Sequence, residues 1–213
     1  MHDLNKIAEL NNLTLDYLNS GSPIFQVKGG YNFTSDSVKL ASTVTEEEID
    51  TLVDFCSGSG IVGLEVVERA TVNNLYSFEI QEELYNACLL SQKHNKFNTK
   101  FYTFLKPVQQ ASNYVTNADV VICNPPFFKA NSGGLSLNNS KLLARHEVTI
   151  TLNEIFKSAS EVLKSGGVFY LLHIADRSNE IEKLALSFNF KIESRKELEG
   201  HLKRVIFKFK NVK

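Results

Sequence analysis

Four consecutive residues, Asn124-Pro125-Pro126-Phe127, could act on an amino group that is bonded to a planar ring. Such an amino group is a poor nucleophile because its lone pair is delocalised into the ring. The Asn124 amide oxygen and the Pro125 carbonyl are two acceptors that can hold both N–H hydrogens, which localises the lone pair on nitrogen. Phe127 can stack on the ring and fix its plane. The tetrapeptide is equally compatible with an ordinary tight loop that ends in a core phenylalanine, since Asn-Pro and Pro-Pro are common turn signals.

The apolar run Val120-Val121-Ile122-Cys123 comes directly before these residues and predicts a buried parallel strand. Two consecutive prolines remove two N–H donors, so the ladder of the sheet cannot continue through them. The four residues therefore form a stiff loop at the carboxyl end of a strand. Open α/β sheets bind their ligands at that edge.

A second candidate site follows the strand predicted at residues 51–55. The chain there runs through Cys56-Ser57-Gly58-Ser59-Gly60 into an apolar helix, an arrangement that lets a ligand approach the backbone at a helix amino end. The next predicted strand, 75–78, ends in Glu79, 21 residues after Gly58. A carboxylate at this distance suits a bidentate grip on ribose hydroxyls. The alternative is an ordinary charge at the start of a helix.

The remaining pattern alternates strands with helices. Strands are predicted at 100–105, 168–173, 190–192 and 205–209, and helices at 81–95, 106–117, 152–163 and 181–188. This alternation predicts a doubly wound parallel sheet that is closed by an antiparallel pair. His173, at a strand end, is expected to be structural.

The amino-terminal part has a different character. Residues 4–18 form a weak pattern that predicts a partly ordered lead-in. A hairpin is expected from strands 24–27 and 31–34 around Gly29-Gly30, and Ser35-Asp36-Ser37 is a helix amino-cap signal. We expect residues 1–48 to form a small lid or cap and residues 49–213 to form the main domain.

Charge is unevenly distributed along a chain whose net charge is −1. Residues 1–60 contain nine acidic and three basic side chains, whereas residues 191–213 contain eight basic and three acidic ones. The basic end permits a local nucleic-acid contact or, alternatively, forms a solvated strand pair with charged outer faces. A long Gly/Asn/Ser-rich segment at 128–146 is typical of a functional or disordered loop, and it contains Lys129, Lys141, Arg145 and His146.

Cys56, Cys88 and Cys123 are odd in number and lack metal-ligand spacing, so we expect no metal site and a reducing compartment. No run approaches the ~20 apolar residues that a membrane helix needs. These observations predict a soluble, cytoplasmic protein with no membrane partner.

Three motifs together resemble the class I S-adenosylmethionine-dependent methyltransferases, in particular the branch that methylates amino groups. They are Asp54-Phe-Cys-Ser-Gly-Ser-Gly60, Glu79-Ile80-Gln81 and Asn124–Phe127, within a match over about residues 13–175. The resemblance implies a Rossmann-like, mostly parallel seven-stranded sheet with an antiparallel last strand, and S-adenosylmethionine as cofactor. It implies Asn124, Pro125, Pro126 and Phe127 as catalytic residues, and Tyr31, Thr34, Asp54, Cys56, Gly58, Gly60, Glu79, Ile80 and Asn124 as cofactor-binding residues.

Three further stretches resemble bacterial tRNA methyltransferases that make N6-methyladenine at position 37 of a valine tRNA. They are Gly30-Tyr-Asn-Phe-Thr-Ser-Asp-Ser37, Ala144-Arg-His-Glu-Val-Thr149 and Leu163-Lys-Ser-Gly-Gly167. This resemblance implies a tRNA anticodon stem-loop as partner, no DNA, and a monomer or weak dimer. RNA contacts are then expected from Lys129, Lys141, Arg145, His146, Lys203 and Arg204.

Two residues depart from the family pattern. Cys56 replaces the first glycine of the cofactor loop, and cysteine tolerates a positive φ poorly. No acid occurs in Tyr102–Pro107, where the family tends to place an aspartate near the cofactor adenine. Methylation of a protein glutamine amide or of a ribosomal guanine N2 uses a similar loop and stays an alternative. A non-catalytic RNA-binding module with a relic cofactor pocket is the alternative from another class.

Overall fold

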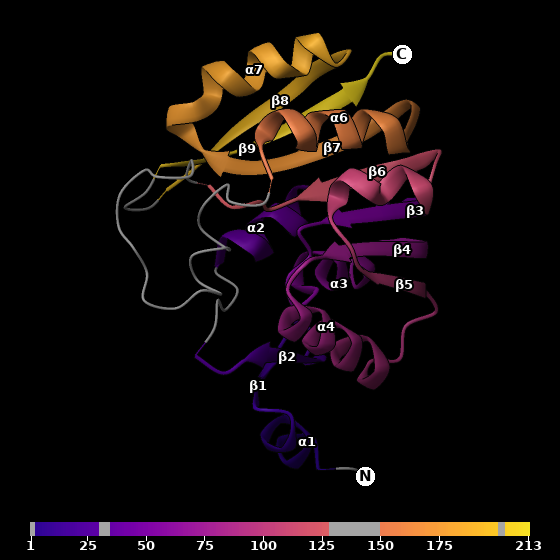
Figure 1. The fold of residues 1–213 in the computed structure, drawn as a ribbon, viewed down its shortest axis with the longest axis vertical. Coiled ribbons are helices and arrows are strands. Elements are labelled where there is room, and N and C mark those ends of the chain that lie inside the picture. The colour runs from indigo at the N-terminus through magenta and orange to yellow at the C-terminus, as the bar shows by residue number, and fades with distance from the viewer. Residues whose placement is uncertain (1–2, 30–34, 128–149, 200–202) are drawn as a thin grey trace.

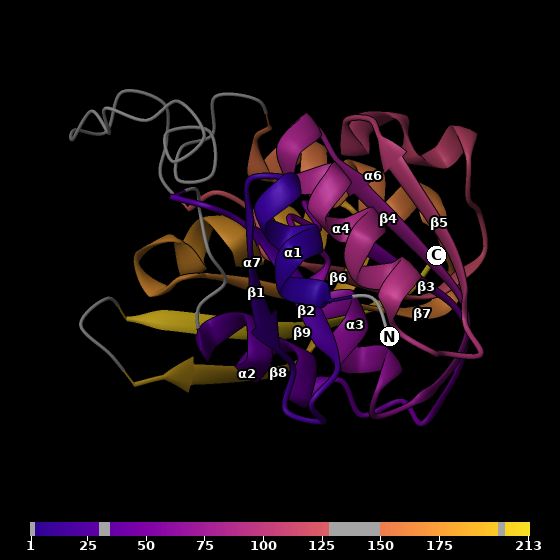
Figure 2. The ribbon, with the colours of Figure 1, turned by 90° about the horizontal axis from the view of Figure 1, so that it is seen from below.

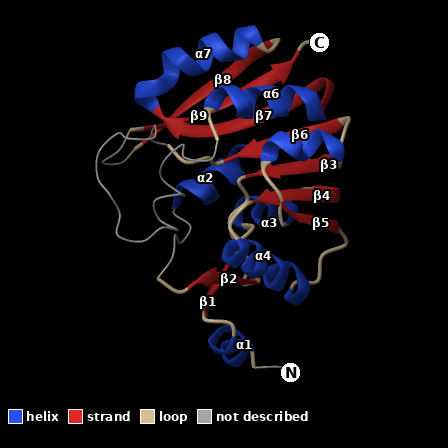
Figure 3. Cartoon of the chain, in the orientation of Figure 1, coloured by secondary structure: helices blue, strands red, loops and turns tan. Residues whose placement is uncertain are grey.

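The strands of the main sheet come from the apolar runs that the sequence shows, and their order places the two candidate loops side by side. A computed structural model describes residues 3–29, 35–127, 150–199 and 203–213 (Figures 1 and 3). In spatial order the seven strands are β5 (Lys100–Leu105), β4 (Thr71–Glu79), β3 (Glu48–Phe55), β6 (Ala118–Cys123), β7 (Leu163–Ile174), β9 (Arg204–Asn211) and β8 (Phe190–Leu198).

All neighbouring strands of this sheet pair in parallel except β9, which runs antiparallel to both β7 and β8. The predicted Rossmann-like sheet is therefore confirmed. The strand order reverses at β3, which has β4 on one side and β6 on the other. The carboxyl ends of β3 and β6 lie level with each other, since Phe55 is the partner of Cys123. Ligands of such sheets bind at this reversal point.

Helices cover both faces of the sheet, which explains the nearly continuous apolar strands. In β6 the side chains of Val121 and Cys123 enter one core, and those of Val120 and Ile122 enter the other, as the two-residue period of a strand requires. Figure 1 shows α6 and α7 on the near face. The first core lies beneath η1 (Val108–Asn113), α6 (Leu152–Val162) and α7 (Ser178–Ser187), and the second beneath α2 (Ser35–Thr43) and α3 (Ile61–Val67).

The amino-terminal hairpin differs from the expected one. Its strands are β1 (Leu13–Tyr17) and β2 (Pro23–Val27), which pair antiparallel, and α1 (Leu4–Leu10) precedes them. Residues 4–18, expected to be a partly ordered lead-in, thus form a short helix followed by a strand, in which residues 13–17 alternate apolar and polar side chains. Residues 31–34, the expected return strand, lie outside the described residues.

The hairpin packs on α4 (Glu82–His94) through a small cluster of its own. Phe25 of β2 lies against Leu84 and Ala87 in this cluster, and its backbone N–H donates to the Ser91 hydroxyl at 2.9 Å. The amino-terminal elements thus share apolar packing with the sheet domain. The division at residue 48 into a lid and a main domain stays a prediction.

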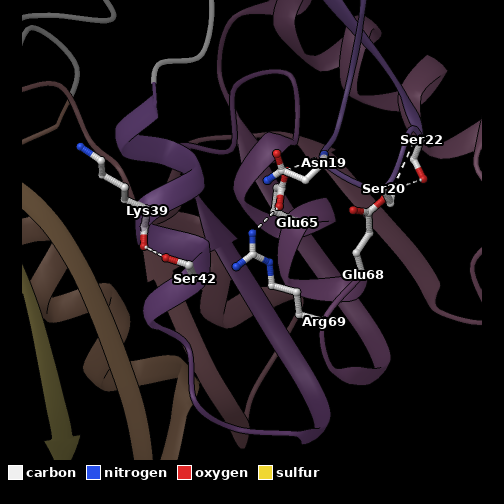
Figure 4. Close-up of polar contacts among 8 residues, drawn as sticks. All are labelled: Asn19, Ser20, Ser22, Lys39, Ser42, Glu65, Glu68 and Arg69. Atoms are coloured by element: carbon white, nitrogen blue, oxygen red, sulfur yellow. Dashed lines mark hydrogen bonds and ion pairs between the residues drawn. The ribbon is translucent and has the colours of Figure 1, made fainter.

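The turn of the hairpin is also fixed to α3 by a buried carboxylate. Glu65 is 1% exposed and accepts from the backbone N–H and the side-chain amide of Asn19, both at 3.4 Å, and from Arg69 at 2.9 Å (Figure 4). These partners compensate the cost of burying a charge. The hairpin is thereby attached to the helix that follows the glycine-rich loop.

Two ion pairs join the acidic and basic ends of the chain. Asp36 of α2 pairs with Arg204 of β9 at 2.8 Å, and Glu46 pairs with Lys208 of β9 at 3.0 Å. Figure 2 shows α2 next to β9. Much of the charge asymmetry seen in the sequence is therefore matched within the molecule.

Smaller differences concern the ends of elements. The helix expected over 106–117 is the short 3-10 helix η1, and β7 begins at Leu163, so the glycines at 166 and 167 lie inside that strand. A short 3-10 turn, η2 (Ala175–Arg177), connects β7 to α7. Among the described residues, no helix has both the length and the apolar character that crossing a membrane requires.

Candidate active site

The glycine-rich loop between β3 and α3 is built from left-handed backbone positions. Cys56 has φ 56° and Gly60 has φ 88°. The cysteine thus adopts the conformation that a glycine usually takes, at a strain on the order of 1 kcal/mol. A Cβ on Gly60 would lie 2.7 Å from the Cys88 sulfur, so this position requires glycine for space as well. The loop therefore has a left-handed position at Cys56 even though the residue is not glycine.

Glu79, at the end of β4, holds this loop from the neighbouring strand. One carboxylate oxygen accepts from the Gly58 N–H at 2.9 Å, and the other accepts from the N–H groups of Ile80 at 2.8 Å and Gln81 at 2.9 Å. Burial raises the pKa of the Glu79 carboxyl, and the three N–H donors oppose that rise. A carboxylate has about four acceptor positions. One therefore remains, and the two-hydroxyl grip expected from the sequence requires the Gly58 bond to open.

Asp54 lies beneath the loop and joins β3 to α3. Its carboxylate accepts from the Gly63 N–H at 3.1 Å, and a Cβ on Gly63 would lie 3.0 Å from the same oxygen. Complete burial raises the pKa of Asp54 to about 8, the charge of Glu79 adds to the rise, and the Gly63 N–H opposes it. Asp54 is thus a structural support of the loop that is protonated at neutral pH.

Titration of Asp54 predicts that its contribution to the free energy of unfolding falls as the pH rises from about 4 to about 8. The unfolded carboxyl loses its proton near its ordinary value of 3.8, whereas the folded carboxyl keeps it up to about 8. The unfolded state then binds fewer protons across this window, and the slope approaches about 1.4 kcal/mol per pH unit. Asp54→Asn keeps an acceptor for Gly63 and does not titrate. Urea unfolding at several pH values should show that the wild type loses stability relative to Asp54→Asn as the pH rises through this window, because the opposite contribution of His173 is common to both proteins. Parallel profiles would contradict this prediction.

Asn124 follows β6 and faces the same cavity as Glu79. Its amide nitrogen donates to the Ser37 hydroxyl of α2 at 3.1 Å. Its amide oxygen is buried and has no hydrogen-bond partner among the residues that the structure describes. Buried polar atoms without partners are uncommon in folded proteins and call for an explanation. The oxygen is an acceptor available to a ligand in this cavity.

Phe127, the last residue of the Asn-Pro-Pro-Phe loop, is 9% exposed. The Arg204 guanidinium lies over its ring, 5.5 Å from the centroid, and the His173 ring meets it edge-on at 5.5 Å. Burial and the nearby Arg177 charge lower the pKa of His173 to about 3, so the imidazole is neutral. His173 thus packs as an uncharged ring beneath the loop. Stacking of Phe127 on a substrate base stays a prediction.

The structure brings most of the predicted cofactor residues to one cavity at the carboxyl edge of the sheet. Of the predicted residues, those that line it are Cys56, Gly58, Glu79, Ile80, Asn124 and Pro126. Gly60 ends the loop and Asp54 supports it from below. Lys203 is exposed, and Arg204 is ion-paired with Asp36. Six predicted residues lie outside the described parts of the chain: Tyr31, Thr34, Lys129, Lys141, Arg145 and His146.

Sequence reasoning missed two parts of this cavity. Ser37 lies in it, although its position in the sequence suggests only a helix start. The four residues Lys106–Gln109, which follow β5, also line the cavity, on the side where the family's aspartate is lacking. Lys106–Gln109 could have been predicted to line the cavity, because they directly follow a parallel strand and ligands bind at that edge of such sheets. Within residues 3–29, 35–127, 150–199 and 203–213, no group of three or more His, Cys, Asp and Glu side chains could hold a metal ion.

Three features of the structure define the Rossmann-like class of cofactor-binding proteins. They are a parallel sheet whose strand order reverses at β3, a glycine-rich loop after β3, and an acidic residue at the end of β4. The family model of the methyltransferase small domain matches residues 32–198. The chain belongs to this family and is a methyltransferase.

Relatives with known names are similar to the chain at modest identity. A tRNA1(Val) (adenine(37)-N6)-methyltransferase of Dyadobacter fermentans is 26% identical over 160 residues, which is 74% of this chain and 65% of the relative. The enzyme of the same name from Shewanella woodyi is 25% identical over 169 residues, covering 75% and 68% respectively. The chain thus spans about two thirds of the length of these relatives.

Solved structures share the fold. The TYW2 protein of M. jannaschii, in complex with AdoMet, superposes with a TM-score of 0.64 at 15% identity, covering 94% of this chain and 87% of that one. TrmN from Thermus thermophilus superposes with a TM-score of 0.60 at 16% identity, covering 84% of this chain and 48% of TrmN.

The cofactor of this enzyme is S-adenosylmethionine, and the cavity fits it. Glu79 would hold its ribose, since the carboxylate keeps one acceptor position after the three N–H bonds. The loop from Cys56 to Gly60 brings its backbone to the cavity wall because the left-handed positions turn it there. Asn124 places an unpartnered acceptor in the same cavity.

Proposed function

We propose that the protein transfers the methyl group of S-adenosylmethionine to the N6 amino group of an adenine in a tRNA anticodon loop, with position 37 of a valine tRNA as the target. The observation that carries this proposal is the buried, unpartnered Asn124 oxygen in the cofactor cavity. The names of the similar enzymes from Dyadobacter and Shewanella support the choice of base and RNA.

Asn124 and Pro125 act by holding hydrogens of the target. The Asn124 oxygen accepts one N–H of the amino group, and the Pro125 carbonyl accepts the other, so the nitrogen lone pair is released from the ring. S-adenosylmethionine, when bound, supplies a methyl group on a positively charged sulfur that is already an activated leaving group. Catalysis by the chain is then mainly positioning, which can recover roughly 7–11 kcal/mol. The nitrogen–carbon bond forms as the carbon–sulfur bond breaks, and the methylated nitrogen, now cationic and acidic, loses its extra proton to water, so no strong general base is required.

Access to the target base has a moderate cost. An adenine in a single-stranded loop must be unstacked before it reaches Asn124, at a few kcal/mol. The loop that begins at Asn124 ends in Phe127, and the Arg204 guanidinium lies over the Phe127 ring; an aromatic ring and a guanidinium plane are two groups on which bases stack. Lys203 is exposed next to Arg204 and can neutralise a phosphate.

Transfer of labelled methyl from S-adenosylmethionine to unmodified total tRNA, followed by nucleoside analysis, tests the proposal. N6-methyladenosine in a single tRNA is the expected product. Label that appears only as N2-methylguanosine in ribosomal RNA, or on a glutamine of a protein, would contradict the proposed substrate while leaving the cofactor chemistry intact.

A further inference from the structure

We propose that Ser37 is a positioning residue that sets which side of the Asn124 amide faces the substrate. This inference rests on the proposed function, in which the Asn124 oxygen accepts an amino hydrogen. The two residues are 87 positions apart in the sequence, yet the Asn124 amide nitrogen lies 3.1 Å from the Ser37 hydroxyl oxygen. Both line the cofactor cavity.

The orientation of an asparagine amide is a chemical choice because its oxygen and its NH2 group have nearly the same shape. The observed orientation points the nitrogen at Ser37 and leaves the oxygen buried without a partner. The opposite orientation would bury an NH2 group in the unpartnered place, and an orphaned donor is less tolerated than an orphaned carbonyl. It would also set N–H groups of Asn124 against the N–H groups of the substrate. Ser37 therefore favours the reactive orientation.

Ser37 is itself held firmly. It is 2% exposed and lies in the first turn of α2. The preceding residue, Asp36, is ion-paired with Arg204 at 2.8 Å, and Leu40 and Ala41, one turn further on, are buried in the second core. A hydroxyl fixed from both sides can hold the amide in one orientation, as a positioning residue must.

Replacement of Ser37 by alanine is the direct test. Without the Ser37 hydroxyl the amide nitrogen has no acceptor on that side, and the opposite orientation, with the NH2 group toward the cavity, becomes the favoured one. We therefore expect Ser37→Ala to lower kcat for tRNA methylation about 5- to 10-fold, a factor that one neutral hydrogen bond commonly controls. The Kd for S-adenosylmethionine should stay within about twofold, because Asn124 then keeps its place and loses only its preferred orientation. Ser42→Ala is the matched control on the same helix. The exposed Ser42 hydroxyl donates to the Lys39 carbonyl at 2.7 Å (Figure 4).

An Asn124→Asp background separates positioning from general support of the helix. The two carboxylate oxygens are equivalent, so no orientation is left to control, and both can accept an amino hydrogen. In this background Ser37→Ala should change the remaining kcat by less than about twofold, since the single hydrogen bond no longer selects an orientation. An equal loss in both backgrounds would overturn the proposal, because a purely structural role of Ser37 has the same effect in each.

Two further results decide the remaining cases. If Ser37→Ala fails to fold, Ser37→Thr keeps the hydroxyl and is expected to retain kcat. A Ser37→Thr protein that binds cofactor but is tenfold slower would overturn the inference.

An unchanged kcat for Ser37→Ala beside an inactive Asn124→Ala would also overturn the inference while leaving the proposed function standing. An active Asn124→Ala protein would instead remove the proposed function itself.

Discussion

Asn124→Ala is expected to lower kcat for methyl transfer on the order of 10³-fold, the upper range for loss of a single preorganised hydrogen-bonding group in an active site. The loss follows because the unpartnered Asn124 oxygen is the acceptor that prepares the amino nitrogen. The Kd for S-adenosylmethionine should change by less than about threefold, because Glu79, the residue predicted to accept from the ribose, is untouched. Single-turnover methylation of tRNA and a cofactor titration measure the two quantities separately.

Asn113→Ala is a suitable control for this experiment. Asn113 is exposed on η1, so its replacement should leave both kcat and the cofactor Kd unchanged. An Asn124→Ala enzyme that methylates at the normal rate would show that the Asn-Pro-Pro-Phe loop is only a turn. An inactive protein that has also lost cofactor binding would show that Asn124 serves mainly to shape the cavity.

Glu79→Ala is expected to weaken S-adenosylmethionine binding about 100-fold, the second large effect. The change removes the ribose acceptor and leaves the N–H groups of Gly58, Ile80 and Gln81 without their partner, and each unpaired group costs about 1–3 kcal/mol unless water replaces it. The cofactor affinity of Glu79→Gln should lie between those of the wild type and Glu79→Ala, about tenfold weaker than that of the wild type. The reason is that the glutamine NH2 group meets the Gly58 N–H donor to donor. Calorimetric titration with the cofactor gives these affinities.

Thermal unfolding without cofactor completes the comparison. Glu79→Ala should unfold at a lower temperature than Glu79→Gln, since two of the three backbone bonds remain available to the amide oxygen of the glutamine. Glu83→Ala, an exposed carboxylate on the following helix, is the control and should change neither affinity nor stability. Unchanged cofactor affinity in Glu79→Ala would refute the assignment of Glu79 to the ribose.

Local sequence signals were sufficient for the sheet domain. The run at 120–123 is apolar on both faces, and the two prolines after it terminate the ladder, so the end of β6 was predictable from residue types alone. The same holds for the strand, glycine-rich loop and helix from β3 to α3. The strand at 24–27 was predicted, but its pairing with residues 13–17 was not, because those residues gave only a weak pattern in the sequence. In the structure Leu13 of β1 and Phe25 of β2 share one apolar cluster with Leu84 and Ala87 of α4, which supports the pairing of β1 with β2.

The backbone conformation of Cys56 could not be predicted from its residue type. Cysteine disfavours a positive φ, so the sequence suggested an altered turn, whereas the residue has φ 56°. The contacts on both sides fix the loop, since Ser57 donates to the Phe78 carbonyl at 3.1 Å and Gly58 donates to Glu79. Tertiary hydrogen bonds outweigh a backbone preference on the order of 1 kcal/mol.

By itself the sequence determined the class of sheet, the cofactor loop, the acid after β4 and the loop with the acceptor oxygen, because each is encoded within a few neighbouring residues. Only the tertiary structure decided which distant residues meet them. The basic side chains of β9 pair with the acids Asp36 and Glu46 from the first quarter of the chain, and Ser37 meets Asn124. Such pairings depend on how α2 packs against the sheet, and no local pattern records that packing.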